Sequence, residues 1–219
     1  EDGIRDIVVT GVQTCALPLC PGIEPGVVSN DLVSGIDFAP TTLSLAGLPI
    51  PDHMEGQVFL GPDATTRDEV IAARDRCDGT VDRIRAVRTH RYKYIRNYHA
   101  DRPYLQFNAY KKLQYPVLAL MESMHARGEL TPEQALFMAE TRPAEELYDL
   151  AADPHEVCNL ADDPTCAAVL ADLRGRLTAW IAHTGDNGEQ SEDPAVVAYW
   201  QEHMANNWVE AMGKRGLDP

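Results

Sequence analysis

The strongest helical pattern of the chain lies in residues 164–183, where apolar side chains recur every three or four positions. Asp163 precedes this segment as a candidate N-cap, and Gly185 follows it as a candidate C-cap. Residues 194–212 carry a second stripe of the same spacing. Both stripes predict amphipathic helices that pack in a core. They comprise Val169, Leu170, Leu173, Leu177, Trp180 and Ile181 in the first segment, and Val196, Tyr199, Trp200, Met204, Trp208 and Met212 in the second.

The middle of the chain shows the two-residue period of β-strands instead. Residues 70–76 and 145–150 are expected to form strands, and residues 83–89 and 92–98 a hairpin that turns at His90-Arg91. Ile84 and Ala86, then Tyr92 and Tyr94, alternate with charged residues, which is typical of an antiparallel sheet with one solvent-facing side. We therefore predict an α+β fold in which a small antiparallel sheet of about four strands packs on the 164–183 helix.

Three further helices are indicated by their end signals. In residues 30–49, Pro40 fits a first helical turn, and Asp37 lies just ahead to accept from the free amides. Residues 115–126 are expected to form a helix that ends near Gly128. Thr131 and Gln134 have the spacing of a capping box at the start of the third helix.

The charge of the chain is strongly acidic, with a net value of −15 over 219 residues, which disfavours binding to nucleic acid. No run of about eighteen apolar residues is present, so we expect no membrane span. A basic cluster interrupts the acidic background. It could face an anionic ligand, or it could be a solvated face paired to local acidic residues. Its members are Arg83, Arg85, Arg88, Arg91, Lys93, Arg96 and Arg102.

The five cysteines show neither a metal-binding spacing nor a disulfide framework. Cys158 and Cys166 lie close enough in sequence for a bridge, although free thiols are the simpler interpretation. Residues 9–18 (VTGVQTCALP) match the translation of a common sequencing-library adapter. We interpret residues 1–19 as an adapter-derived, non-native segment and expect the native protein to extend upstream of Cys20.

Several short motifs follow one another in a specific order. Together they resemble the sulfatase family of the alkaline-phosphatase superfamily, over about residues 21–185. The motifs are VSN at residues 28–30, DFAPT at 37–41, LAGLP at 45–49, MEGQ at 54–57, RAVRT at 85–89, YKYI at 92–95, ELYDL at 146–150, DPHE at 153–156 and NLA at 159–161.

This resemblance implies a sulfuric ester hydrolase whose parent fold is α/β. Residues 20–65 would be a leftover piece of the large alkaline-phosphatase-like α/β domain and residues 66–188 the C-terminal subdomain. Residues 189–219 would be a linker and a C-terminal helix. Intact members carry calcium and a formylglycine made from Cys or Ser in a C/S-x-P/A-x-R motif. Residues 15–19 fail that motif. We assign no catalytic or metal-binding residue here, and expect the fragment to bind neither cofactor and to be inactive alone.

Substrate contacts are what this part of a sulfatase could still supply. Arg74, Asp75 and Arg76 lie at a strand end before a turn, where an arginine fork suits a sulfate or carboxylate on a sugar. Asp82 could accept from hydroxyl groups, and His99 is a further candidate, with Tyr104 a weaker one. The alternative is an Arg–Asp network that fastens the smaller domain to the larger one.

The leading hypothesis for function is a sulfatase acting on a sulfate ester or N-sulfate of a sugar or aryl compound. Its expected partners are a sulfated small molecule or glycan and the missing N-terminal sulfatase domain, with no nucleic acid and no membrane. A phosphonate or phosphodiester hydrolase of the same superfamily is one alternative. A non-catalytic module that binds anionic glycans is another. The compartment stays open, although family habit points to the periplasm or to secretion.

Overall fold

The computed structural model describes residues 28–190 and 192–216 of the chain, and the adapter-like residues 1–19 lie outside them. The chain divides into two units, Glu1–Asp68 and Glu69–Pro219, each of which forms its own set of contacts.

The described part of the first unit is mostly loop. It contains the short 3-10 helix η1 (Gly35–Asp37) followed by α2 (Phe38–Leu45), which is shorter than the pattern predicted. Asp37 is buried, but its side chain does not cap α2. The carboxylate instead accepts from the amides of Ser34 and Gln57, at 2.7 and 2.8 Å, and pairs with Arg67. Asp37 therefore ties three loop segments together, which corrects the predicted capping role.

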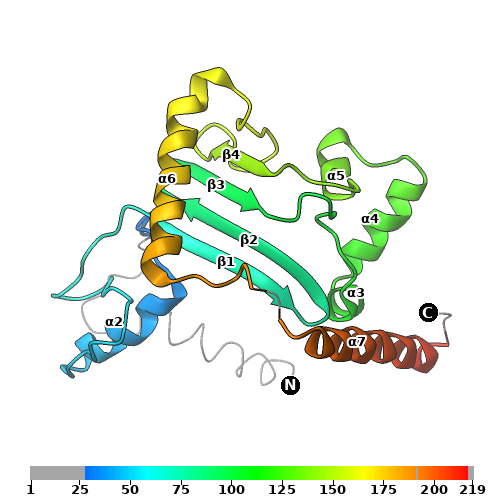
Figure 1. Cartoon of the computed structure of the whole chain (residues 1–219), viewed down its shortest axis with the longest axis horizontal. Helices are drawn as coiled ribbons and strands as arrows, with labels where there is room; N and C mark the ends of the chain where they lie inside the picture. The colour runs from blue at the N-terminus through cyan, green and yellow to red at the C-terminus, as the bar shows by residue number, and fades with distance from the viewer. Residues whose placement is uncertain (1–27, 191, 217–219) are drawn as a thin grey trace. The chain divides into compact units, whose positions relative to one another are not determined.

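The second unit is built on a four-stranded antiparallel sheet in the order β1-β2-β3-β4, as predicted. The strands are β1 (Val70–Cys77), β2 (Thr80–Arg88), β3 (Tyr92–Asn97) and β4 (Glu145–Asp149). Helix α6 (Ala167–Thr184), entered through the 3-10 turn η2 (Pro164–Cys166), crosses one face of this sheet (Figure 1). Asp163 accepts from the amide of Thr165, and Gly185 ends α6 with a φ of 63°. Both predicted caps are confirmed.

The register of the hairpin is the one expected from a turn at His90-Arg91. Tyr94 pairs with Val87, and Ala86 pairs with Ile95. Val87 and Tyr94 therefore form the core face with Leu173 of α6, whereas Ile84 and Ala86 lie on the other side. The predicted hairpin is confirmed, and its register places Ile84 and Ala86 on the face opposite Tyr94.

The remaining helices of the second unit are α3 (Ala109–Gln114), α4 (Pro116–Ala126), α5 (Pro132–Phe137) and α7 (Pro194–Lys214). The capping box of α5 is present, but α3 was not predicted. Helix α7 packs on α3, and Trp208 meets Phe107 edge to face. Its stripe is not all core: Met212 is buried, whereas Val196 and Tyr199 are exposed. That part of the prediction is wrong.

Two sequence-based expectations concern absences in the described residues. Within them, no helix combines the length and hydrophobicity that crossing a bilayer requires. Cys158 and Cys166, which both fall in the described ranges, are not bridged to each other and carry free thiols.

Candidate functional site

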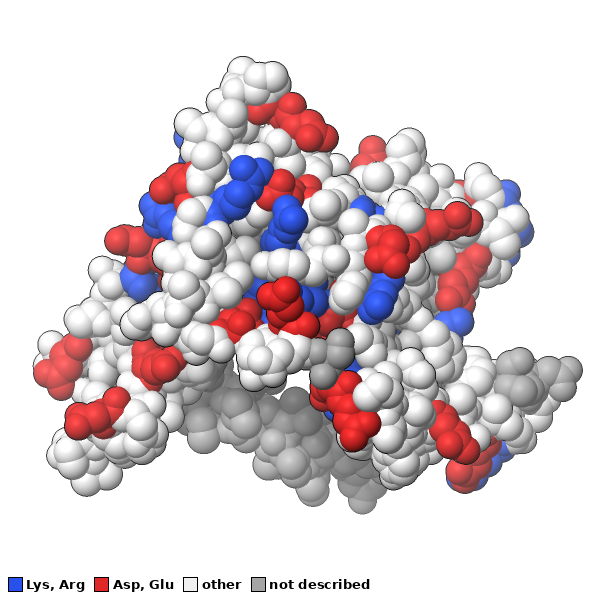
Figure 2. Space-filling view, viewed as in Figure 1, with Lys and Arg blue, Asp and Glu red and all other residues white. Residues whose placement is uncertain are grey.

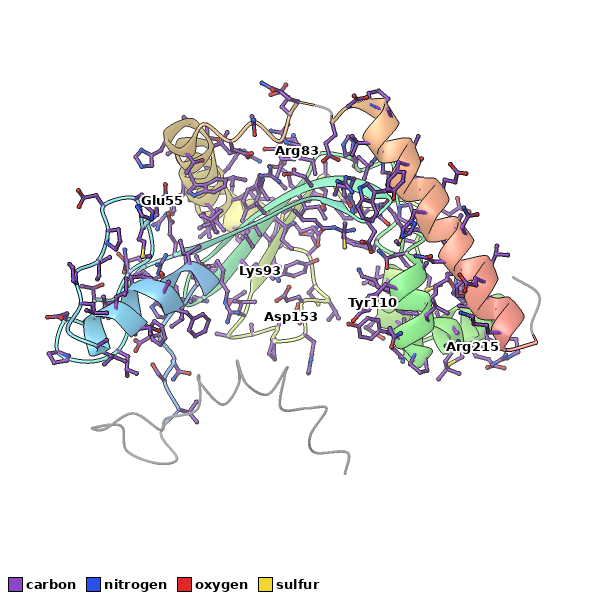
Figure 3. All side chains as sticks on the ribbon, turned by 90° about the horizontal axis from the view of Figure 1, so that it is seen from below. Glu55, Arg83, Lys93, Tyr110, Asp153 and Arg215 are labelled. Atoms are coloured by element: carbon purple, nitrogen blue, oxygen red, sulfur yellow. The ribbon has the colours of Figure 1, made fainter. Side chains whose placement is uncertain are left out.

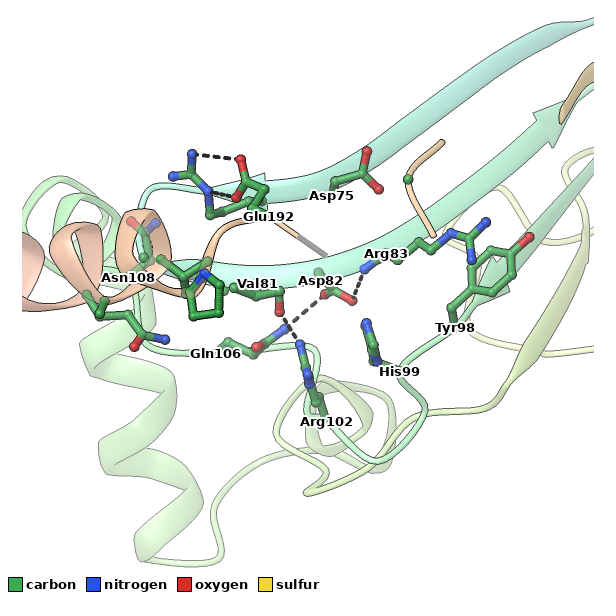
Figure 4. Close-up of a pocket in the computed structure, with 18 of the residues that line it drawn as sticks. Asp75, Val81, Asp82, Arg83, Tyr98, His99, Arg102, Gln106, Asn108 and Glu192 are labelled. Atoms are coloured by element: carbon green, nitrogen blue, oxygen red, sulfur yellow. Dashed lines mark hydrogen bonds and ion pairs between the residues drawn. The ribbon is translucent and has the colours of Figure 1, made fainter. Parts of the chain in front are cut away.

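A cleft of about 1430 Å³ opens where the β1–β2 hairpin meets the start of α7. Four stretches line it: the end of β1 with the start of β2, the segment after β3, the loop that leaves α6, and the first turns of α7. Figure 4 shows how side chains from these stretches converge. The polar and aromatic side chains that line it include Asp75, Arg76, Asp82, Arg83, Tyr98, His99, Arg102, Gln106, Asn187 and Glu192.

One wall of the cleft is held by a buried arginine. Arg85, 1% exposed, donates from Nε and Nη2 to the two carboxylate oxygens of Asp186, at 2.7 and 2.9 Å. It also donates to Asp75, whose carboxylate is half exposed. The hydrogen bonds from Arg85 lower the pKa of Asp186 to about 2. The loop after α6 is therefore fixed to β1 and β2 as it enters the cleft.

The same loop is held again at its far end. Arg76 of β1 pairs with Glu192, and the hydrogen bond that Arg76 donates to Glu192 raises the pKa of Arg76. The Arg76 guanidinium also lies 5.9 Å from the ring centroid of Trp200 on α7. The loop between α6 and α7 therefore lines the cleft between two ion pairs.

Asp82 lines the cleft, and its carboxylate is bound by neighbouring side chains. It pairs with Arg142, both side chains being almost completely buried, and it accepts from Gln106 at 2.9 Å. Burial raises the pKa of Asp82, but the hydrogen bonds from Arg142 and from the amide of Arg83 lower it by more. The pKa of Asp82 therefore lies below its ordinary value. Such a carboxylate is suited to holding the segment after β3 in place.

Arg83 lines the cleft, although the sequence identified it only as one member of the basic cluster. It lies beyond Arg85 on the same face of β2, and its carbonyl accepts from the amide of Tyr98 at 3.0 Å. Its guanidinium carbon lies 3.9 Å from the centroid of the Tyr98 ring. The hairpin register could have located this pair, since continuing the predicted ladder places Arg83 opposite Tyr98.

The predicted contact residues divide between the cleft and other places. Asp75, Arg76, Asp82 and His99 line the cleft, whereas Arg74 does not. The Arg74 carbonyl accepts a hydrogen bond from Arg85, so Arg74 helps to position the buried arginine that holds the cleft wall. Tyr104 also lies outside the lining. Burial, followed by the charge of Glu146, raises the pKa of its hydroxyl. Whether any of these residues contacts substrate stays a prediction.

Most of the basic cluster is paired to acidic residues that are distant in sequence. Arg91 pairs with Asp149 at 2.7 Å and Lys93 with Glu156 at 2.6 Å. Acidic and basic side chains are intermixed in Figure 2. Figure 3 shows that Lys93 lies on the side of the sheet away from Arg83. The solvated-face interpretation therefore fits Arg91 and Lys93, whereas Arg83 forms no ion pair with a described carboxylate.

The described residues contain no group of three or more His, Cys, Asp or Glu side chains that could hold a metal ion. His99 faces a cleft whose carboxylates Asp82 and Glu192 are already bound to arginines. This donor set does not fit a calcium site, which needs several uncommitted oxygen ligands around one point.

Comparison with known proteins gives consistent matches. The family described as N-sulphoglucosamine sulphohydrolase, C-terminal, matches residues 14–112. An ulvan-active sulfatase of Formosa agariphila is 38% identical over 198 residues, which are 90% of this chain and 33% of that protein. A second ulvan-active sulfatase of the same organism is 29% identical over 173 residues, which are 75% of this chain and 32% of that protein.

Among solved structures, a 2-O GAG sulfatase aligns with a TM-score of 0.46 at 22% identity. The alignment covers 74% of this chain and 28% of that chain. The chain thus spans about a third of the length of the two ulvan-active relatives that it matches.

Proposed function

We propose, from the premise that this chain belongs to the sulfatase family and corresponds to the C-terminal part of its members, that the complete protein hydrolyses sulfate esters on a sugar. The observation that carries the proposal is the 38% identity to an ulvan-active sulfatase along 90% of this chain. The cleft supports it, because arginine, amide and aromatic side chains are the groups that bind anionic sugars.

The reacting groups would come from the part of the protein that precedes this chain. A calcium ion and a formylglycine, when present, would supply the electrophilic and nucleophilic chemistry at the sulfate. The described residues offer no cage for the ion, so the role proposed for this chain is to bind and orient the sugar. On this proposal the 219-residue chain does not hydrolyse sulfate esters by itself.

Exposed apolar side chains in the first unit favour packing of another domain on this unit. Large apolar side chains on and around α2 are exposed, with Ile36 at 55%, Phe38 at 47% and Leu48 at 55%. An apolar row of this kind marks an interaction surface. We propose that the N-terminal part of the complete sulfatase packs on it, because the relatives carry about twice as much additional chain as this sequence covers.

Two experiments test the proposal. The first is sequencing of the gene upstream of codon 20, where we expect a Cys or Ser in a C/S-x-P/A-x-R motif. An unmodified Thr or Ser nucleophile at that place would favour the phosphonate or phosphodiester alternative instead.

The second experiment assays the 219-residue chain for sulfate release from ulvan and from a chromogenic aryl sulfate, with and without calcium. We expect no release under either condition. Calcium-dependent turnover by this chain would contradict the proposed division of roles.

A further inference from the structure

Some charged side chains of the cleft form ion pairs, and others do not. Its carboxylates Asp75, Asp82 and Glu192 are each paired with an arginine. Arg83 and Arg102 line the same cleft and form no ion pair with a described carboxylate, although the charge of Arg83 is among the causes that lower the pKa of Asp186. Glu189 also lines it but is exposed, where solvent and salt weaken its field. The cleft therefore offers positive charge to a ligand.

Arg83 is better placed than Arg102 to bind that ligand. Arg102 already donates from Nη1 to the carbonyl of Val81, at 2.5 Å. The Nε of Arg83 is shielded from solvent and makes no hydrogen bond to any described residue. No hydrogen bond among the described residues uses a terminal guanidinium nitrogen of the partly exposed Arg83, so these nitrogens can donate to a ligand oxygen.

The direction of Arg83 is set by its surroundings. Its amide donates to the Asp82 carboxylate at 2.9 Å, and its carbonyl closes the ladder to Tyr98. Stacking on the Tyr98 ring holds the guanidinium plane, so less entropy is lost when a planar anionic group binds. Figure 4 shows Arg83 and Tyr98 together at one end of the cleft.

Neutral side-chain amides line the same cleft as Arg83 and Tyr98 and could bind the hydroxyl groups of a sugar. Asn187 and Gln190 line the cleft, are exposed, and make no side-chain hydrogen bond within the described residues. Such amides can donate to and accept from ring hydroxyls. We propose that Arg83, stacked on Tyr98, is a specificity-determining residue that binds an anionic group, sulfate or carboxylate, on a sugar of the substrate. This inference rests on the proposed function and deepens it.

The test is a binding titration of the 219-residue chain with sulfated oligosaccharides prepared from ulvan. We expect the dissociation constant to rise at least about tenfold for Arg83→Gln, or about 1.4 kcal/mol, and less for Arg83→Lys. Arg88→Gln is the matched control, because Arg88 lies exposed on the same strand and outside the cleft. We expect that control to stay within about twofold of wild type. Thermal unfolding of each variant checks that it is folded.

Desulfated oligosaccharide and inorganic sulfate identify the anionic group. Loss of Arg83-dependent binding on desulfation assigns a sulfate, and retained Arg83-dependent binding assigns a carboxylate. Binding of inorganic sulfate alone, with equal affinity, overturns the sugar-specific role. The inference is also overturned if wild type does not bind the oligosaccharides, or if Arg83→Gln and Arg88→Gln have the same effect. None of these results touches the proposed function, which the sequence upstream and the sulfate-release assays test separately.

Discussion

Asp186 accepts two hydrogen bonds from Arg85, a residue that lies 101 positions earlier in the chain. Arg85 lies on the same face of β2 as the core residue Val87. Its charge is therefore buried, next to the end of α6. The chain leaves α6 at Gly185 and immediately meets this charge. Along this face of β2 the side chains therefore change from the apolar Val87 to the charged Arg85 and Arg83, and Arg83 lines the cleft.

Asp186→Asn should destabilise the protein strongly. The substitution leaves Arg85 with only the half-exposed Asp75 as a carboxylate partner, and unpairing a buried charge costs roughly 3 kcal/mol. Urea unfolding measures the change. Asp172→Asn is the control, since Asp172 forms an exposed pair with Arg176, and it should cost below about 0.5 kcal/mol. Equal costs for the two variants would mean that the Arg85–Asp186 pair does not hold the loop.

Gly188→Ala should displace the loop that walls the cleft. A Cβ at this position would lie 2.1 Å from Nη2 of Arg85 and 2.7 Å from Oδ1 of Asp75. We expect a lower melting temperature and weaker oligosaccharide binding. Gly175→Ala on α6, where a Cβ meets nothing within 4 Å, should instead raise stability by about 0.5–1 kcal/mol. A neutral Gly188→Ala would show that the loop is not packed against Arg85.

Asp82→Leu and Arg142→Leu should each cost about 3–5 kcal/mol, because each leaves a fully buried partner unpaired. The double variant should cost less than the sum of the two, since both charges are then removed. Denaturant unfolding of the four proteins gives the coupling. Additive costs would contradict the pairing. Because Asp82 is engaged in this way, we predict that its main contribution is to stability rather than to substrate contact.

Acid should weaken the fold through Asp186 and Glu145. Hydrogen bonds from Arg85 lower the pKa of Asp186 to about 2, and those from Arg174 lower the pKa of Glu145 to about 2. A lowered pKa stabilises the fold above the ordinary value, and that stabilisation is lost as pH falls toward the folded-state value. The free energy of unfolding should therefore decline from about pH 4.5 to pH 2. The decline should be shallower in Asp186→Asn, and an identical slope would contradict the assignment.

The elements could be predicted where the signal is local. The α6 stripe, its caps and the hairpin all depend on neighbours within a few positions, and each formed as expected. Helix α3 was missed because six residues give too little periodicity.

The cleft could not be predicted in the same way. Its ion pairs join residues that are far apart in sequence, as Arg76 and Glu192 show at 116 positions. Asp75, Arg76, Asp82 and His99 could be named from the sequence as contact candidates, and all four line the cleft, but the sequence could not show which of their charges are already paired. Arg83 was hidden for the same reason, because a run of arginines does not show which member lacks a partner.

Sulfate release by a chimera tests the central claim most directly. The chimera carries the N-terminal two thirds of the ulvan-active sulfatase to which this chain is 38% identical. Residues 28–219 of this chain then replace the C-terminal part of that sulfatase. Ion chromatography measures the sulfate freed from ulvan. We predict calcium-dependent release by the chimera and none by the 219-residue chain alone. A chimera that unfolds cooperatively but frees no sulfate would contradict the assignment of this chain as the C-terminal part of a sugar sulfatase.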